Sequence, residues 1–385
     1  MEGHVHPDFG AVSEKLATLT SKRSAIGGAA VAVYHRGELV VDVWTGTRDA
    51  AGAPWERDTM AMSFSTTKGV VATVVHRLVD QGLVRYDEPV VSYWPEFAAA
   101  GKERITVREL LTHRAAMHRV RPLVDGADDL LDWDGMIARL AAAPPAWPPG
   151  LRPGYHALTY GWLVGEVIRR VTGLTVEEVV QRELAGPLGV GGLHIGAPRS
   201  DRHRVADLLL DERKLERLDR LFDRLERYER TRPAVEALAV PGFLQLDPAR
   251  VLDAEIPAAN GVFTARGLAR MYAGLVTPEA FDGPPLVSAK TLAAATRVQT
   301  TQRDVVVGFP MRWRLGYHLA ATTAGVPPRG FGHFGFGGSG AWGDPDSGLA
   351  VALVLNQVAG SPFADTRLLR IGGAALRAAR QRVGA

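Results

Sequence analysis

A serine and a lysine three residues apart form the clearest candidate for chemistry in this sequence. The segment AMSFSTTKGVV contains Ser65 and Lys68. A serine hydroxyl is a poor nucleophile until a base takes its proton, and lysine can do so when burial or neighbouring positive charge favours the neutral amine. If a helix begins here, side chains at i and i+3 share one face and can meet. The N–H groups and dipole of the helix start would also stabilise an oxyanion.

The same pair also has a purely structural interpretation. Ser65 could cap the helix N-terminus while Lys68 extends into water. The chain has 11 serines and 6 lysines, and random placement gives roughly 0.2 pairs with this spacing, so the spacing alone is only suggestive. The context favours catalysis, because the pair lies between a hairpin-like segment and an apolar helix, where Ser-x-x-Lys enzymes have it.

The elements that must position this pair are strand-rich at both ends of the chain. Residues 27–46 contain two β-rich runs around Arg36-Gly37 and predict a hairpin. Residues 65–81 have helical periodicity, and Gly82 is a suitable end for that helix. Three further strands are expected near the C-terminus, in residues 312–320, 331–342 and 348–356.

Helices are expected mainly in the middle of the chain. Residues 105–113 and 158–173 carry helical periodicity, and the Pro/Gly-rich stretch 144–154 between them predicts a loop. Helices are also expected near residues 9–19 and 362–382.

This arrangement predicts an α/β protein of the α+β type. An antiparallel sheet would be built from the N- and C-terminal segments and flanked by helices, with a helical domain inserted. Residues 1–80 and 256–385 would form the α/β domain. Residues 81–255 would form the mainly helical domain, with the active site at the junction.

The charged segment 205–230 predicts a further helix. Leu215, Leu218, Phe222 and Leu225 follow heptad spacing. Such a stripe could form a coiled coil or bind a partner. Coiled coils usually need three or four heptad repeats, however, and this segment is barely long enough for that number. The interpretation we favour is a surface helix packed on its own domain.

Composition excludes several classes of protein. The chain of 385 residues has no cysteine, so disulfides, thiolate metal sites and a cysteine nucleophile are ruled out. A formal charge of +3 is too small to indicate a nucleic-acid-binding surface. No metal or organic cofactor is expected, because His4, His6 and Asp8 fall in a predicted flexible tail without further ligands.

Without a signal-like start or an apolar run of about 18 residues, a cytoplasmic protein is expected. The oligomeric state stays open.

Five segments, in order along the chain, resemble the serine β-lactamase and penicillin-binding-protein superfamily. They are SFSTTKG (63–69), ITVRELLTH (105–113), YHALTYGWLVGEVI (155–168), IPAANGVFTARGLARMYAGL (256–275) and FGHFGFGGSGAWGDPDSGLAVALVLN (331–356). The chain is most similar to the class C β-lactamase-like branch, which includes the family VIII carboxylesterases. The resemblance implies a β-lactamase/transpeptidase-like fold.

The resemblance also implies roles for residues far from Ser65. Tyr155 would lie beside Ser65 and Lys68 and shuttle the proton, as a phenolate if nearby cations lower its pKa. His333 would occupy the position of the lysine in the family's Lys-Thr-Gly element. Gly335 would let the substrate approach the strand backbone, and the N–H of Phe336 would be the second oxyanion donor beside that of Ser65.

Departures from the family pattern point to the kind of substrate. Histidine at 333 holds a carboxylate less reliably than lysine, because it is mostly neutral at pH 7. Ala157 replaces the asparagine that binds an amide side chain. Both changes favour hydrolysis of small or medium acyl esters over β-lactams. Acyl transfer at the same site, a D-amino-acid amidase or peptidase, a β-lactamase, and a non-catalytic binding protein of the same fold remain alternatives.

Two glycine-rich matches are set aside. Gly335, Gly337 and Gly340 fit G-x-G-x-x-G, but a strand is expected next instead of the helix that a dinucleotide site needs. Ser339 lies in a near match to the lipase elbow, which Ala341 breaks. We therefore interpret Ser339 as a turn residue.

Overall fold

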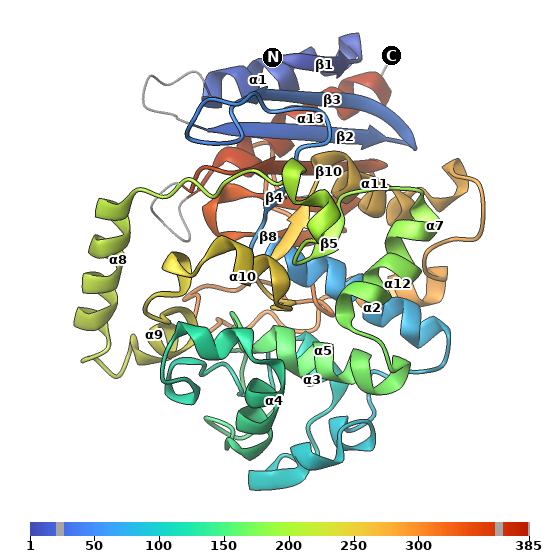
Figure 1. The fold of residues 1–385 in the computed structure, drawn as a ribbon. Coiled ribbons are helices and arrows are strands. Elements are labelled where there is room, and N and C mark those ends of the chain that lie inside the picture. The colour runs from blue at the N-terminus through green and yellow to red at the C-terminus, as the bar shows by residue number, and fades with distance from the viewer. Residues whose placement is uncertain (21–26, 359–364, 384–385) are drawn as a thin grey trace.

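A seven-stranded antiparallel sheet takes its strands from both ends of the chain (Figure 1). The computed structural model describes residues 1–20, 27–358 and 365–383. In sheet order the strands are β1 (Glu2–Val5), β3 (Glu38–Gly46), β2 (Gly28–His35), β10 (Leu349–Leu355), β9 (Gly340–Asp344), β8 (Phe331–Phe334) and β7 (His318–Leu319). Pairing of β2 with β10 joins the N-terminal and C-terminal strands at the middle of the sheet.

The sheet is covered on both faces, which explains why its central strands are apolar throughout. Along β2, Val31 and Val33 pack toward α1 (Gly10–Thr20) and α13 (Arg367–Val383). The alternate residues Ala32 and Tyr34 belong to the larger core on the opposite face, which includes α11 (Ala265–Val276). Side chains of a strand alternate between faces, so a strand buried on both sides needs apolar residues at every position.

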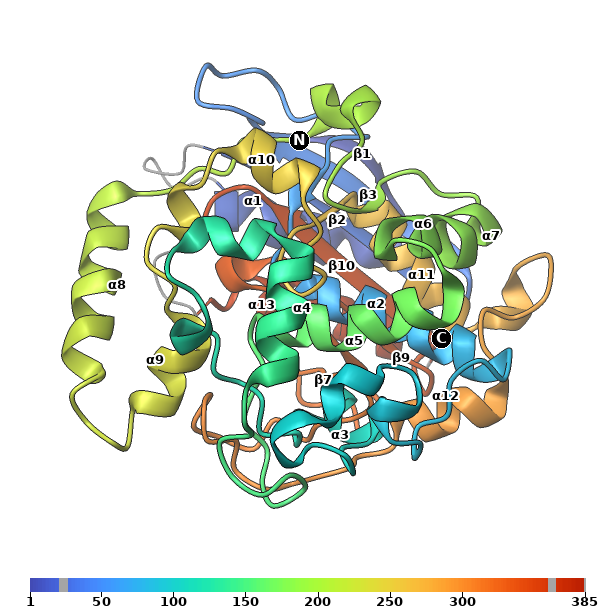
Figure 2. The same cartoon turned by 60° about the horizontal axis from the view of Figure 1, so that its bottom comes forward.

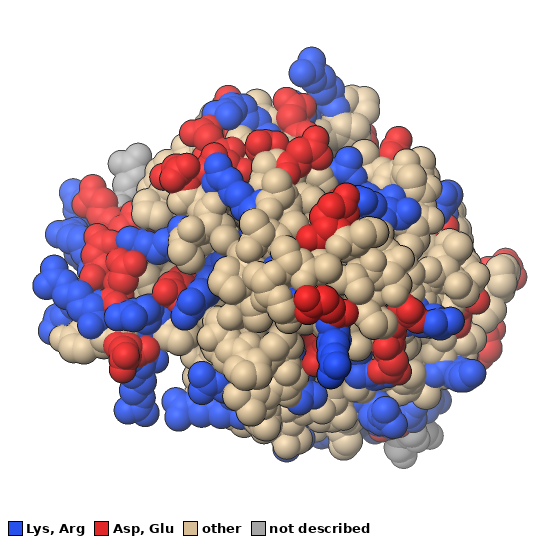
Figure 3. All heavy atoms as spheres, turned by 90° about the horizontal axis from the view of Figure 1, so that it is seen from below, with Lys and Arg blue, Asp and Glu red and all other residues tan. Residues whose placement is uncertain are grey.

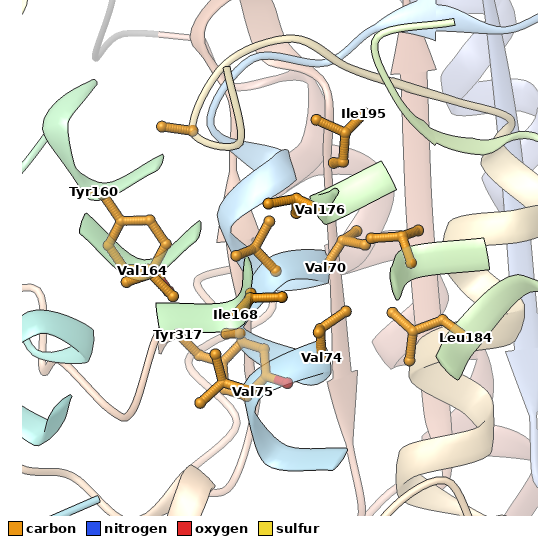
Figure 4. Packing of buried hydrophobic residues seen from close by; sticks show 14 of the residues in the cluster. Val70, Val74, Val75, Tyr160, Val164, Ile168, Val176, Leu184, Ile195 and Tyr317 are labelled. Carbon is orange, nitrogen blue, oxygen red and sulfur yellow. The ribbon is translucent and has the colours of Figure 1, made fainter. Parts of the chain in front are cut away.

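Helix α2 (Thr66–Asp80) runs through the centre of the larger core. Figure 4 shows Val70, Val74 and Val75 surrounded by side chains from several segments, among them Tyr160 and Ile168. A helix that is apolar on most of its circumference is stable only when it is buried in this way. The first turn of α2, which carries the candidate nucleophile, therefore belongs to a helix whose residues are almost all buried.

The remaining helices fill the middle of the chain. Their bounds are α3 (Val107–Leu111), α4 (Trp133–Ala142), α5 (Thr159–Thr172), α6 (Val176–Val180), α7 (Gly186–Leu188), α8 (Glu212–Leu225), α9 (Arg232–Leu238), α10 (Pro248–Asp253) and α12 (Ala289–Thr296). A small second sheet has the order β4 (Ala61–Met62), β6 (Gly261–Phe263), β5 (Leu193–Ile195). In the described part of the chain, no helix has both the length and the apolar character that a membrane crossing requires.

The predicted fold class is confirmed, and the hairpin at Arg36-Gly37 forms with both residues at positive φ (52° and 85°). One prediction near the N-terminus was wrong, because residues 2–5 are an edge strand paired with β3 and not a flexible tail. The segment 331–342 forms two strands instead of one, since Gly337 at φ 83° reverses the chain between them. The proposed division into domains at residues 80 and 255 stays a prediction.

Candidate active site

A strained turn presents Ser65 at the start of α2. The small sheet fixes the approach, since the N–H of Ser63 donates to the carbonyl of Gly261 over 2.8 Å. The next residue, Phe64, has φ 46°, a conformation that bulky residues rarely adopt. Such backbone strain persists only where the surroundings impose it, and it is frequent at functional sites.

The hydroxyl of Ser65 does not cap its helix. Ser65 occupies the N-cap position, but its side chain makes no capping hydrogen bond. Instead its Oγ lies 3.0 Å from Nζ of Lys68 and 2.7 Å from the hydroxyl of Tyr155. The structure thus brings together the three residues that the sequence analysis singled out, and the capping interpretation of Ser65 was wrong.

Lys68 is completely buried, although the alternative interpretation placed it in water. Its Nζ donates to the carbonyl oxygens of Ala157, at 2.7 Å, and Ala258, at 2.9 Å. Burial lowers the pKa of Lys68 well below its usual value, because the charged form loses its hydration. A neutral amine can accept the proton of Ser65.

Asp304 and Trp313 hold Tyr155, and the sequence analysis named neither. Asp304 Oδ1 accepts the backbone N–H of Tyr155 at 3.1 Å, and its Oδ2 accepts the indole N–H of Trp313 at 3.0 Å. The Trp313 ring stacks on the Tyr155 ring with centroids 5.5 Å apart. Burial raises the pKa of Tyr155, so the resting side chain is a phenol and not the phenolate that the sequence analysis considered.

His333 lies beside Tyr155 without a positive charge. The two rings are 6.2 Å apart, and the His333 ring also meets the edge of His318 at 4.6 Å. Its Nδ1 lies 3.0 Å from the carbonyl of Phe334, which fixes the proton on Nδ1. Burial lowers the pKa of His333 well below 6.5 and that of His318 to about 4. Both imidazoles are therefore neutral at pH 7.

The end of β8 passes against the turn that carries Ser65. A Cβ atom on Gly335 would lie 2.2 Å from the carbonyl oxygen of Ser63 and 2.9 Å from Oγ1 of Thr66. The ring of the next residue, Phe336, meets the ring of Phe64 edge-on at 5.2 Å. Only glycine permits this approach, which places the Phe336 backbone next to the start of α2.

A cavity of about 260 Å³ opens onto Ser65 and Tyr155. Its walls are largely apolar. Most of the apolar side chains come from α8 (Leu215, Leu218, Phe222), the end of α9 and the segment after it (Leu238, Phe243, Leu244), the loop 307–313 (Val307, Phe309, Met311, Trp313) and the C-terminal region (Phe334, Phe336, Leu368, Leu369). No lysine or arginine occurs among the described residues that line it, whereas two carboxylates, Asp219 and Asp365, do.

The charged helix α8 (Glu212–Leu225) is part of the wall of this cavity, whereas its heptad pattern predicted only a surface helix packed on its own domain. Its heptad stripe was the available signal, and the stripe packs over this cavity. Of the two segments expected to shape the pocket, residues 195–255 contribute many of the described cavity residues, whereas residues 115–150 contribute none of them.

The residues that were set aside have structural partners. Ser339 Oγ accepts the backbone N–H of Leu355 at 3.2 Å, and the glycine-rich segment turns from β8 into β9 with no helix following. Nearby, Nδ1 of His113 accepts the N–H of His156 at 3.2 Å, and its ring meets the Tyr155 ring edge-on at 5.0 Å.

Comparisons with known proteins agree with the observed fold. A model of the family named Beta-lactamase matches residues 14–376. The chain is 41% identical over 363 residues to the esterase/beta-lactamase LipL of Mycobacterium tuberculosis, covering 92% of this chain and 83% of LipL. A penicillin-binding-protein homologue from Caulobacter crescentus superposes with a TM-score of 0.87 at 35% identity, covering 98% of this chain and 99% of its own. A family VIII carboxylesterase gives 0.84 at 36% identity, with the same coverage.

Proposed function

The chain belongs to the beta-lactamase family of serine hydrolases, and from that premise we propose that it hydrolyses uncharged carboxylic esters through an acyl-enzyme on Ser65. The observation that carries the proposal is the contact of Ser65 Oγ with both the buried Lys68 and Tyr155. A structural serine has no need of two titratable partners. Esterase names among the relatives support the reaction class.

In the proposed acylation step, Lys68 is the first base. A neutral amine has two N–H bonds and one lone pair, and the carbonyls of Ala157 and Ala258 accept both N–H bonds. The lone pair is left for the hydroxyl proton of Ser65. Tyr155, with its raised pKa, keeps its proton until the ester bond breaks and then donates it to the leaving alcohol oxygen.

Deacylation reverses these transfers. The Tyr155 phenolate left by acylation takes a proton from water, and the hydroxide attacks the acyl carbonyl. Lys68, now an ammonium, returns its proton to Ser65 Oγ as the acid leaves. Both residues regain their resting forms. In both steps the backbone N–H groups of Ser65 and Phe336 would bind the oxyanion, a role that the close packing of Gly335 on Ser63 supports.

The charge of the cavity favours a neutral substrate. By the family resemblance His333 would take the position of the family's lysine, and burial keeps its imidazole uncharged at pH 7. Asp219 and Asp365 add negative charge to the described lining, although Arg367 pairs with Asp365. A substrate carboxylate, such as that of a β-lactam, would meet no lysine or arginine among the described residues that line the cavity. We therefore expect weak β-lactamase activity at most.

The first experiment compares p-nitrophenyl acetate, butyrate and octanoate with a chromogenic cephalosporin. For wild type we expect ester turnover and little cephalosporin cleavage. Ser65→Ala should lower kcat by roughly 10⁴-fold or more, since removing a catalytic nucleophile has effects of that order. Ser339→Ala is the matched control in the same cavity and should retain activity. Ester turnover that survives Ser65→Ala would refute the mechanism, and efficient cephalosporin cleavage would refute the substrate class.

A further inference from the structure

One face of α8 carries the apolar side chains of an otherwise charged helix. Leu215, Leu218 and Phe222 follow at intervals of three and four residues, so they share a face, and all three line the cavity above Ser65. Leu221 is not among the residues that line the cavity and is 48% exposed. The remaining surface is covered by exposed charges, including Arg213, Glu216, Arg217, Arg220, Asp223 and Arg224.

The apolar face of α8 is only partly covered by protein. Leu215, Leu218 and Phe222 are half-buried, in contrast to the completely buried valines of α2. Figures 1 and 2 show α8 standing at the edge of the molecule, beside α9, and Figure 3 shows charged side chains gathered on that edge. The helix therefore presents apolar surface to the cavity that a bound apolar group could remove from water.

The opposite walls of the cavity are also apolar. Leu238 and Phe243 come from the segment around the end of α9, and Val307, Phe309 and Met311 come from a separate loop. The Phe309 side chain is 46% exposed although it lines the cavity. A hydrocarbon group between these walls and α8 would contact apolar atoms on more than one side.

Polar contacts fix the position of α8 from outside the cavity. Arg121 pairs with Glu226 at 3.1 Å and with Asp223 at 3.7 Å. Before the helix, the N–H of Leu209 donates to the carbonyl of Asn356 at 2.9 Å, which joins this segment to the end of β10. The apolar face of α8 is thereby held toward the cavity.

We propose that α8 is the selectivity wall of the site, and that Leu218 and Phe222 bind the hydrocarbon chain of a neutral ester whose carbonyl lies at Ser65. This inference rests on the proposed function and adds to it the substrate class, an ester with an extended apolar chain. Continuity of the α8 face with the Ser65 cavity and the lack of a lysine or arginine among its described lining residues support a neutral hydrocarbon as the occupant.

The test measures kcat/KM for two ester series. One varies the acyl chain of p-nitrophenyl esters from acetate to decanoate, and the other varies the alcohol of acetate esters from ethyl to octyl. In at least one series, wild type should prefer the longer chain. The double variant Leu218→Ala/Phe222→Ala should lower the ratio of long-chain to short-chain kcat/KM by roughly tenfold or more, mainly through KM, because several methylene contacts are lost. The series in which the double variant changes this ratio shows whether the acyl chain or the alcohol of the ester lies under α8.

Leu221→Ala is the matched control, on the same helix but outside the cavity lining. It should keep the wild-type chain-length profile. Equal profiles for the double variant and wild type in both series would overturn the inference while leaving ester hydrolysis intact.

Binding separates failure of this inference from failure of the proposed function. In the Ser65→Ala background, calorimetric titration with 1-octanol should show binding that the double variant weakens roughly tenfold. If 1-octanol binds and the double variant weakens that binding, but wild type turns over no ester, the α8 wall is supported and the esterase is rejected. A 1-octanol affinity unchanged by the double variant would reject the wall.

Discussion

The residues around Ser65 and helix α8 both line the same cavity, but the two regions are built in opposite ways. Around Ser65, a buried lysine and a buried tyrosine converge on one hydroxyl, and backbone carbonyls and a buried aspartate fix their positions. Helix α8 has half-buried leucines, an exposed charged face, and surface ion pairs as supports. Packing on all sides fixes the geometry around Ser65, whereas one side of α8 faces solvent.

This difference matches two tasks, catalysis at Ser65 and substrate selectivity at α8. Proton transfer needs donor and acceptor atoms held within a few tenths of an ångström, which a rigid, water-poor interior provides. Recognition of an apolar chain needs area more than exact geometry, and a half-exposed helix can supply area at small cost in stability. Substitutions near Ser65 should therefore abolish turnover, while those on α8 should change which ester is preferred.

Apart from removal of the nucleophile itself, the largest effect is expected at Lys68. Lys68→Met keeps an apolar stem in the buried site but removes the base, so kcat/KM for a p-nitrophenyl ester should fall roughly 10³-fold. In wild type, kcat/KM should rise with pH as Lys68 loses its proton, with a midpoint well below 10.5 because burial lowers its pKa. Stopped assays from pH 5 to 10 on both proteins check this.

Lys102→Met is the control for that substitution. Lys102 is also completely buried, and its Nζ also donates to backbone carbonyls, those of Ala99 and Ala141 among them. Its loss should lower the free energy of unfolding but leave kcat/KM of the folded protein unchanged. Equal losses of activity in the two variants would mean that Lys68 acts only through folding.

An intermediate effect is expected at Gly335. In Gly335→Ala, the new Cβ would lie 2.2 Å from the Ser63 carbonyl, so β8 must move away from the turn that carries Ser65. We expect kcat to fall roughly 10²-fold, as for the loss of one oxyanion donor. Gly10→Ala, where a Cβ meets nothing within 4 Å, is the control. Wild-type kcat in Gly335→Ala would show that the approach of β8 does not matter for catalysis.

The smallest effect concerns acid stability, which should depend on the buried interior and not on α8. Burial lowers the pKa of His118 to about 3, against about 6.5 in an unfolded chain. Between these values the unfolded state binds more protons, so the free energy of unfolding decreases as pH falls through this window. His118→Phe keeps a ring on Trp147, 4.6 Å away, and should remove up to about 1.4 kcal/mol per pH unit of this dependence.

Urea unfolding at pH 7.5, 5.5 and 4.5 measures that slope. Leu221→Ala on α8 should keep the wild-type slope, because it changes no titrating group. If His118→Phe also keeps the wild-type slope, the acid sensitivity must arise elsewhere in the molecule.

Short-range patterns predicted much of the fold. The hairpin at Arg36-Gly37 and the helix after Ser65 follow from turn residues and periodicity close together in the chain. The edge strand β1 was missed because its partner β3 lies about 40 residues away, and pairing rather than local propensity makes it a strand. Helix α8 was predicted from its stripe, but no local signal shows which surface a stripe will cover.

By itself the sequence determined the pair Ser65 and Lys68, because the geometry of i and i+3 on a helix depends only on local backbone structure. Tertiary structure decided what this pair can do. Tyr155 and the carbonyl of Ala258 reach the site from 90 and 190 residues away, and the burial that lowers the pKa of Lys68 needs the whole core. These contacts depend on how distant segments cross, since packing and desolvation are properties of the assembled interior.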